Sequence, residues 1–401
     1  IAKFSFFLAL FILFPVNSRV HAWPVPDIGQ TKCYNASPAN GGEIACPSPG
    51  QPFYGQDGNY IINPRSYTKL DDQGNVLPDN ATMWTMIRDN VTGLIWENKT
   101  NDGSIHDGSK TFTWCDTNPA TNGGNQGTCI AGATPTDTHA FIKALNDAHY
   151  GGFSDWRLPT IKELLTTVDL SRANPSINPA WFPNTTFWSH WSSTSGTTNT
   201  YAWDIDLSVV IWTGGWAGGN VIRSHYKSTA LAVRAVRGIQ SESLNNFIVN
   251  GDGTVTDRVT GLMWQQQTIK NVTWQSTLSS AEGSTLAGYD DWRVPNLAEL
   301  QSLVDYSKGN PAIDTGTFPD TVTSMTYFVS TSNNTNYYDD IWVLDFSWGN
   351  ASQTSKSYSL ATRAVRGGQV RVAGRLIISA PIQSAQWQRG DRKTIAWDTA
   401  G

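Results

Sequence analysis

One long sequence pattern occurs twice in this chain, and it restricts the fold more than any other feature. GFSDWRLPTIKELLTTVDLSRANPSINPAWFP, at residues 152–183, recurs as GYDDWRVPNLAELQSLVDYSKGNPAIDTGTFP at residues 288–319. Both stretches carry DWR, a proline, EL, VD, NP and FP at identical offsets. Flanking blocks recur in the same order: DNVTGLIW and LAVRAVRG frame the first stretch, and DRVTGLMW and LATRAVRG frame the second. The pattern therefore indicates an internal duplication.

Two copies with their own beginnings and ends predict two globular modules rather than a solenoid. We place copy one at residues 76–240 and copy two at residues 245–368. We expect each copy to fold separately, around its own interior.

Within each copy the sequence predicts a strand, two helices and a closing set of strands. TGLIW and TGLMW place turn residues before an apolar stretch, which is typical of a turn entering a strand. Two helix starts carry the capping-box pair, Thr160 with Glu163 and Asn296 with Glu299. Segments such as YAWDIDLSVVIW alternate as strands do, and RAVRG is predicted as a final strand beside the first one. This order predicts an α+β module.

Four cysteines form two local pairs, Cys33 with Cys46 and Cys115 with Cys129. Proximity favours these pairings among the three that four cysteines allow, and an exported protein meets an oxidising compartment. A zinc site is disfavoured because no CxxC occurs and the histidines do not cluster near the cysteines. The first pair marks a leader segment over residues 23–75. The second staples a Gly/Asn-rich surface excursion that only copy one carries.

The N-terminal residues 1–22 predict a secretory signal peptide. A lysine precedes an apolar run that ends near a small-residue site, and the run is too short to favour a membrane span. The mature chain is therefore expected to lack a transmembrane segment and to be secreted or held at the cell surface. A formal net charge of −5 at pH 7 argues against nucleic acid as the main partner.

The order TGLxW, DWRLP–EL, FP, WSST, AW and VR–VRG resembles the bacterial Lcl C-terminal domain family, over residues 85–238 and 248–367. The resemblance implies a C-type-lectin-like fold in an exported protein. The founding member is an adhesin whose C-terminal domain binds glycosaminoglycans and forms a trimer. Many members carry a cysteine in the last motif where this chain has Ala235 and Ala364, and the collagen-like stalk that precedes the trimer is absent here. Trimer formation is therefore not carried over.

The predicted fold class is α+β, with two tandem C-type-lectin-like modules. A disulfide-containing leader precedes them. Residues 374–401 look like the opening strands of an immunoglobulin-like β domain, truncated by the end of the sequence.

The DWR signature admits two interpretations. In the structural one, which we favour, the tryptophan fills the core while the aspartate and arginine pair with and cap neighbouring elements. In the functional one, Arg157 grips an anionic ligand. The signature residues are Asp155, Trp156, Arg157, Asp291, Trp292 and Arg293.

No residue set predicts catalysis, a metal or a cofactor. Nucleophilic catalysis needs a serine or cysteine near a histidine base, and His190 and His225 stand at no known spacing and are missing from copy two. The resemblance to formylglycine-generating-enzyme-like proteins stops at their cysteine pair, since copy two has no cysteine. The EPN and QPD tripeptides of calcium-dependent lectins are absent, and NGDGTVTD (250–257) favours a tight turn over a calcium loop. We expect a protein that is not an enzyme.

Aromatic residues in turn-rich stretches predict a ligand surface. Flat indoles suit sugar rings, and nearby cations would attract sulfated or carboxylated glycans. The alternative is that many of these rings fill the cores. The candidate ligand contacts are Trp212, Trp216, Arg223 and Lys227 in copy one, and Tyr337, Tyr338 and Trp348 in copy two.

These patterns predict a secreted or cell-surface binding protein. Its expected partner is a glycan, such as a glycosaminoglycan-like polysaccharide, or a surface protein. The alternative function is that of a non-catalytic structural or assembly module within an exported multidomain protein.

Overall fold

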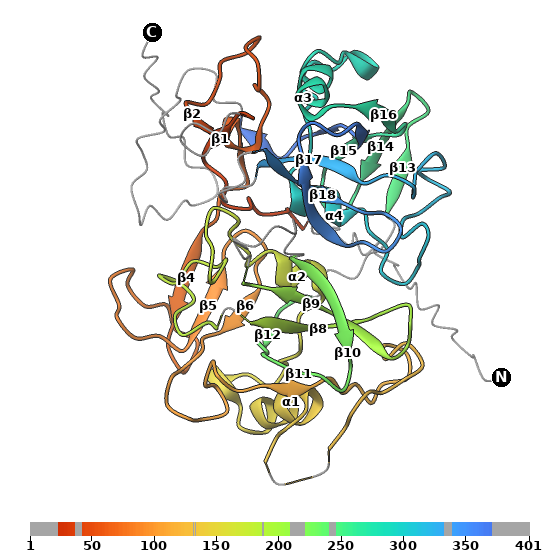
Figure 1. Cartoon of the computed structure of the whole chain (residues 1–401). Helices are drawn as coiled ribbons and strands as arrows, with labels where there is room; N and C mark the ends of the chain where they lie inside the picture. The colour runs from red at the N-terminus through yellow and green to blue at the C-terminus, as the bar shows by residue number, and fades with distance from the viewer. Residues whose placement is uncertain are drawn as a thin grey trace, which may run out of the picture.

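The computed structural model describes residues 23–36, 42–130, 132, 134–186, 188–208, 221–239, 246–332 and 339–370. Over these residues it is a mixed α/β fold with several sheets and few helices. The predicted signal peptide and the predicted immunoglobulin-like segment lie outside the described residues. Figure 1 shows copy one in orange to green and copy two in teal to blue, with the red leader beside copy two.

Each copy builds a small four-stranded sheet in which its last strand pairs with its TGLxW strand, as predicted. The first sheet also contains a strand that lies ahead of residue 76 in the sequence, so residues before the predicted start of copy one belong to its fold. In copy one the strands are β4 (Tyr67–Leu70), β5 (Met86–Asp89), β6 (Ile95–Glu97) and β12 (Val236–Arg237). In copy two they are β13 (Phe247–Val249), β14 (Thr254–Asp257), β15 (Met263–Gln265) and β21 (Val365–Arg366).

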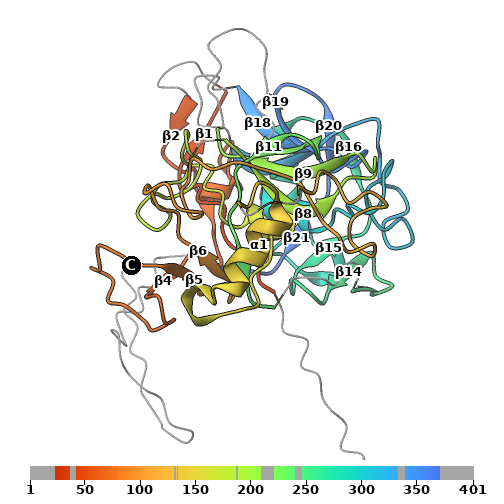
Figure 2. The ribbon, with the colours of Figure 1, turned by 90° about the horizontal axis from the view of Figure 1, so that it is seen from below.

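Two helices follow in each copy. Copy one has α1 (Thr138–Asp147) and α2 (Ile161–Leu165), and copy two has α3 (Trp274–Glu282) and α4 (Leu297–Ser302). Both predicted capping boxes are confirmed: the Thr160 and Asn296 side chains accept from the backbone N–H of Glu163 and Glu299, whose carboxylates reach back to the N-cap. Figure 2 looks onto α1, on the side of copy one away from copy two.

The copies share one eight-stranded sheet, in the order β16-β20-β17-β18-β19-β10-β9-β8. Its two halves join where Ile222 pairs with Ala351. A two-stranded sheet of β7 (Phe112–Thr113) and β11 (Ala230–Leu231) lies beside it in copy one. Copy one supplies β8 (Ser189–Ser195), β9 (Tyr201–Asp206) and β10 (Ile222–Tyr226). Copy two supplies β16 (Ile269–Val272), β17 (Tyr327–Ser332), β18 (Asp340–Leu344), β19 (Ala351–Ser355) and β20 (Leu360–Thr362).

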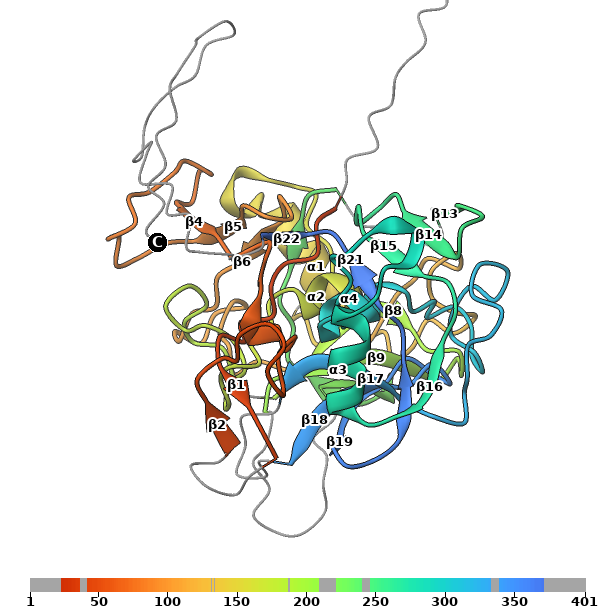
Figure 3. The same ribbon diagram turned by 90° about the horizontal axis from the view of Figure 1, so that it is seen from above.

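The expectation of two separate interiors is wrong. One cluster of buried apolar side chains draws on both copies, including Ile205 and Ile222 of copy one and Leu300 and Leu344 of copy two. Helices α2 and α4 contact each other across this core, near the centre of Figure 3. Each copy leaves an apolar sheet face and helix uncovered, and the other copy covers them, which removes that surface from water. Two smaller clusters belong to one copy each.

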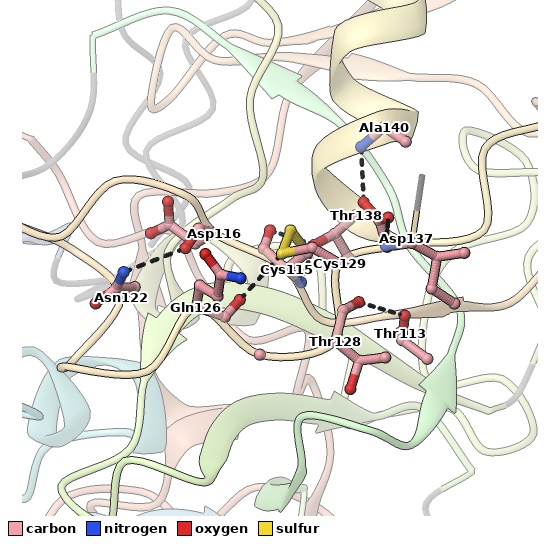
Figure 4. The surroundings of a disulfide bond; sticks show 12 residues. Thr113, Cys115, Asp116, Asn122, Gln126, Thr128, Cys129, Asp137, Thr138 and Ala140 are labelled. Atoms are coloured by element: carbon pink, nitrogen blue, oxygen red, sulfur yellow. Dashed lines mark hydrogen bonds between the residues drawn. A yellow bond between two sulfur atoms is a disulfide. The ribbon is translucent and has the colours of Figure 1, made fainter. Parts of the chain in front are cut away.

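The leader is part of the same folded body. It forms β1 (Cys33–Tyr34), β2 (Glu43–Ile44), the short 3-10 helix η2 (Asp57–Asn59) and β3 (Ile61–Ile62), which pairs with β22 (Gln369–Val370) after copy two. Both predicted disulfides are confirmed, Cys33–Cys46 and Cys115–Cys129. Figure 4 shows the second of them, where Thr113 donates to the carbonyl of Thr128 beside the staple.

Candidate functional site

A cleft of about 740 Å³ opens on one face of the copy-one half of the sheet. It lies between β10, the beginnings of β8 and β11, and the turn after β9. Its lining combines one exposed tryptophan with acidic and basic side chains and a short apolar wall. The lining residues are Thr111, Asn174, Trp188, Ser189, Asp206, Ser208, Arg223, His225, Ala230 and Leu231.

Strand alternation gathers the charged residues on that face. Arg223 of β10 pairs in register with Asp204 of β9, and His225 lies two residues further along. Side chains two residues apart point to the same side of a sheet, so Asp204, Asp206, Arg223 and His225 share one side. The intervening Ile205 points into the shared core. The core packing of β9 therefore fixes which residues face the cleft.

Two short ion pairs organise the charges. Arg223 Nη2 lies 2.6 Å from Asp206 Oδ2, and His225 Nδ1 lies 2.7 Å from Asp204 Oδ2. The hydrogen bond to Asp204 raises the pKa of His225 above its usual value. Asp204 is buried, and its Oδ1 has no hydrogen-bond partner among the described residues. That oxygen is therefore an acceptor that the fold leaves unused.

Trp188 forms the aromatic edge of the cleft. It stands just before β8 with 59% of its surface exposed. Its carbonyl oxygen lies 2.8 Å from Nδ1 of His190, which is buried and whose pKa burial lowers to about 3. A neutral, immobilised histidine thus fixes the backbone from which the indole projects.

The predicted copy-one contacts lie in different places in the structure. Arg223 lines the cleft with about a third of its side chain exposed. Lys227, by contrast, is buried, and its ammonium donates to the carbonyls of Asn122 and Asn125 and to Ser195 Oγ at 2.8, 2.7 and 2.9 Å. The expectation that it attracts an anionic ligand is therefore corrected: this cation holds the stapled excursion in place. Trp212 and Trp216 lie outside the described residues.

Of the predicted copy-two contacts, only Trp348 lies among the described residues. Tyr337 and Tyr338 lie outside the described residues. Trp348 is 48% exposed, and its ring lies so close to Gly309 that a Cβ there would sit 2.4 Å from it. Trp342 is buried in β18.

The signature residues contact other parts of the fold. Trp156 and Trp292 are buried, and their indole N–H groups donate to backbone carbonyls at 2.8 and 3.0 Å. Arg157 makes two bonds to Glu163 at 2.7 and 2.8 Å, and Arg293 makes two to Glu299, each at 2.6 Å. The aspartates reach the final strands, with Asp155 2.7 Å from Arg237 and Asp291 2.6 Å from Arg366. The repeated motif thus connects each second helix to the last strand of its copy.

The sequence model of the Lcl C-terminal domain matches residues 85–237 and 253–366. The chain belongs to the Lcl C-terminal domain family. No match is found among curated proteins. The family and the two disulfides are compatible with an exported protein.

The charged cleft belongs to the first Lcl C-terminal domain. The strand pairings Ile222–Ile205 and Ala351–Leu344 align β10 with β19 and β9 with β18. In the second domain this alignment gives Ser352 for Arg223, Thr354 for His225 and Val343 for Asp204, while the repeat alignment gives Met325 for Trp188. Of the charged set, only Asp206 keeps a charged counterpart, Asp345, so the second domain lacks the Arg223 and His225 ion pairs.

Sequence reasoning missed Trp188, Asp204 and Asp206. A signal for them was present: Trp188 and Trp191 are three residues apart, so on a strand they point to opposite sides, and one of them had to leave the core. The two aspartates of YAWDID are two apart and share a side.

Other features of the described residues are negative. Among them, no helix is both long and apolar enough to cross a membrane. Across the same residues, no group of three or more histidine, cysteine, aspartate or glutamate side chains is placed to hold a metal ion.

Proposed function

We propose that this protein is an exported binding protein, secreted or held at the cell surface, that recognises a glycan through the cleft of its first Lcl C-terminal domain. The observation that carries the proposal is the exposed Trp188 indole beside the Arg223–Asp206 and His225–Asp204 pairs. We propose a non-catalytic role.

The chemistry of the cleft suits a sugar ring. An exposed indole offers a flat apolar face on which the C–H face of a pyranose can stack. The Asp206 carboxylate, the His225 imidazole and the Arg223 guanidinium beside it supply acceptors and donors for ring hydroxyls. The raised pKa of His225 favours its cationic form, which would attract a carboxylate or sulfate on the glycan.

A structural or assembly role is the second candidate. It is favoured by the signature arginines and aspartates of both domains, which form ion pairs within the fold. The two functions predict different behaviour for Trp188, because an exposed side chain contributes little to folding.

The test measures retention of the full chain on immobilised heparin at low salt, alongside a panel of neutral polysaccharides. We expect binding to at least one polysaccharide, and Trp188→Ala to weaken it at least about tenfold, since stacking and hot-spot contacts contribute more than about 1.4 kcal/mol. The matched control is Tyr226→Ala, which removes a 56% exposed ring from the opposite side of β10. Absence of any polysaccharide binding, or equal losses in both variants, would contradict the proposal.

A further inference from the structure

A second cleft of about 740 Å³ lies in the first domain, on a different surface. It runs along α1, past the beginning of α2 to the end of β8, and it reaches Tyr306 and Ser307 of the second domain. Side chains that define it include Ile142, Arg157, Thr160, Lys162, Thr194 and Ser195. We call it the α1 groove.

The leader fills the corresponding place in the second domain. The repeat aligns Thr194 with Thr331 and Ser195 with Ser332. Thr331 Oγ1 donates to Asp57 Oδ2 at 2.9 Å, and Ser332 Oγ donates to Gln56 Oε1 at 2.8 Å. Gln56 precedes the 3-10 helix η2, and Asp57 is its first residue.

More of the leader follows the same path. The Tyr60 ring lies 5.7 Å from the guanidinium of Arg293, the counterpart of Arg157, and its hydroxyl donates to Glu282 at the end of α3. Phe53 packs against Trp274 at the start of α3, with ring centroids 6.1 Å apart. The leader therefore lies along α3, the counterpart of α1, as well as on β17.

Exposure of matching residues shows that this cover is absent from the first domain. The Arg293 side chain is 1% exposed and the Arg157 side chain is 22% exposed. Thr331 and Ser332 are fully buried, whereas Thr194 and Ser195 are only half-buried. In the same way Leu278 of α3 is buried, and its counterpart Ile142 on α1 is half-buried.

The two disulfide-bonded loops explain why the first domain lacks only part of the cover that the leader gives the second domain. Lys227 lies over the Trp114 ring and donates to Asn122 of the excursion, whereas Lys356 lies over the Trp274 ring and donates to Asn35 of the leader at 2.9 Å. The indoles of Trp114 and Trp274 donate to Ser192 and Val329, which the repeat aligns. The two disulfide-bonded loops thus accept the equivalent lysine at the same position of the two domains.

After its cysteine loop the leader continues into Gln56, Asp57 and Tyr60. In the first domain the Asn122 carbonyl accepts from Ser195, as Gln56 accepts from Ser332, but within the described residues nothing takes the place of Asp57 or Tyr60. The corresponding surface is the open α1 groove.

We propose that the α1 groove docks a loop of a partner protein with the chemistry of leader residues 53–60. Such a loop carries a carboxyl side chain followed by an aromatic ring, as Asp57 and Tyr60 do in the leader. Thr194 receives the carboxyl side chain, and the ring lies over Arg157. Ser195 Oγ is already engaged by the excursion, because it donates to the Asn122 carbonyl at 3.2 Å and accepts from Lys227. Lys162, which stands where the second domain has Ala298, also lines the groove, and its ammonium donates to the Ser302 carbonyl of the second domain at 2.6 Å. A second copy of this chain is not the partner, because each leader is already bound to its own second domain.

The probe is a fluorescently labelled synthetic peptide of residues 51–62, QPFYGQDGNYII, titrated into the full chain. We expect saturable binding at one site per chain, measured by anisotropy. An Asp57→Ala change in the peptide should weaken binding about tenfold, because it removes the carboxyl oxygen that accepts from Thr194.

Protein variants locate the binding site. His139→Trp, at an exposed groove-lining position of α1, should block binding. The matched control is Gln275→Trp, at the corresponding exposed position of α3, which should leave binding unchanged. Both variants should keep the wild-type melting temperature, since both positions face solvent.

The proposal is overturned if the peptide shows no saturable binding. It is also overturned if His139→Trp binds like the wild type, or if Gln275→Trp loses binding equally, because the peptide would then be replacing the leader on the second domain. Glycan binding at the charged cleft is measured separately, so either proposal can fail without the other.

Discussion

Ile222 of β10 and Ala351 of β19 face each other across the junction of the two domains, and they occupy the same position of the duplicated fold. Both are fully buried. The two domains therefore join in the common sheet through equivalent residues, one from each domain. The junction resembles the isologous contact of a symmetric dimer, formed here within one chain.

This junction predicts cooperative unfolding. Ala351→Asp would bury an unpaired carboxylate in the shared interior, and we expect a loss of about 3–5 kcal/mol in the free energy of unfolding. Urea unfolding followed by tryptophan fluorescence should show one transition that moves as a whole. Ser224→Asp, on the exposed part of β10, is the control and should change stability by less than about 0.5 kcal/mol. Two transitions, with only one of them shifted, would contradict the shared core.

The two signature arginines should differ in their contribution to stability. Arg293→Met leaves Glu299 buried without its partner, and we expect a loss of about 3–5 kcal/mol. Arg157→Met should cost less, because the 22% exposure of the Arg157 side chain lets water reach the site. Chemical denaturation of the two variants makes the comparison, and equal losses would show that the leader does not shield the second pair.

Docking of the leader should weaken as pH rises. Burial, and next the nearby Asp27 charge, raise the pKa of Asp57 well above 3.8. A raised folded-state pKa means that the stabilising contribution is complete below about 3.8 and is lost as pH passes the raised value. Asp57→Asn keeps an oxygen for Thr331 but does not titrate. Its melting temperature relative to the wild type should therefore increase from about pH 4 to about pH 8. A constant difference would contradict the protonated state.

Binding of an acidic polysaccharide should also depend on pH. The hydrogen bond to Asp204 raises the pKa of His225, so the imidazolium persists above pH 6.5 and is lost as pH rises through the raised value. Heparin retention should fall over that window in the wild type, whereas His225→Gln should show weaker binding with a flatter profile. An unchanged profile in the variant would assign the dependence to another group.

The parts of the fold that depend on neighbouring residues were predictable from sequence. The Thr160 and Asn296 caps, both disulfides and the pairing of the last strand with the TGLxW strand are confirmed. Each is encoded by a few side chains at fixed spacing, and the duplication shows the same encoding twice.

The parts that depend on tertiary partners were not predictable. Nothing in β10 or β19 alone marks Ile222 and Ala351 as partners, because an apolar strand residue is equally consistent with a core of its own. Lys227 follows Arg223 and His225 and was interpreted as part of a surface patch, yet three oxygens contributed by Asn122, Asn125 and Ser195 bury it. Of the predicted contacts, Arg223 lines the cleft, while Asp204 and Asp206 required the register of β9.

The bond from Lys356 to Asn35 has a practical consequence for anyone cutting this chain into pieces. Much of the region ahead of the first domain packs on the second domain, although the whole first domain separates the two in the sequence. A recombinant fragment trimmed to begin at the first recognisable repeat would therefore damage the distant half of the protein as well as the adjacent one, which would lose β4.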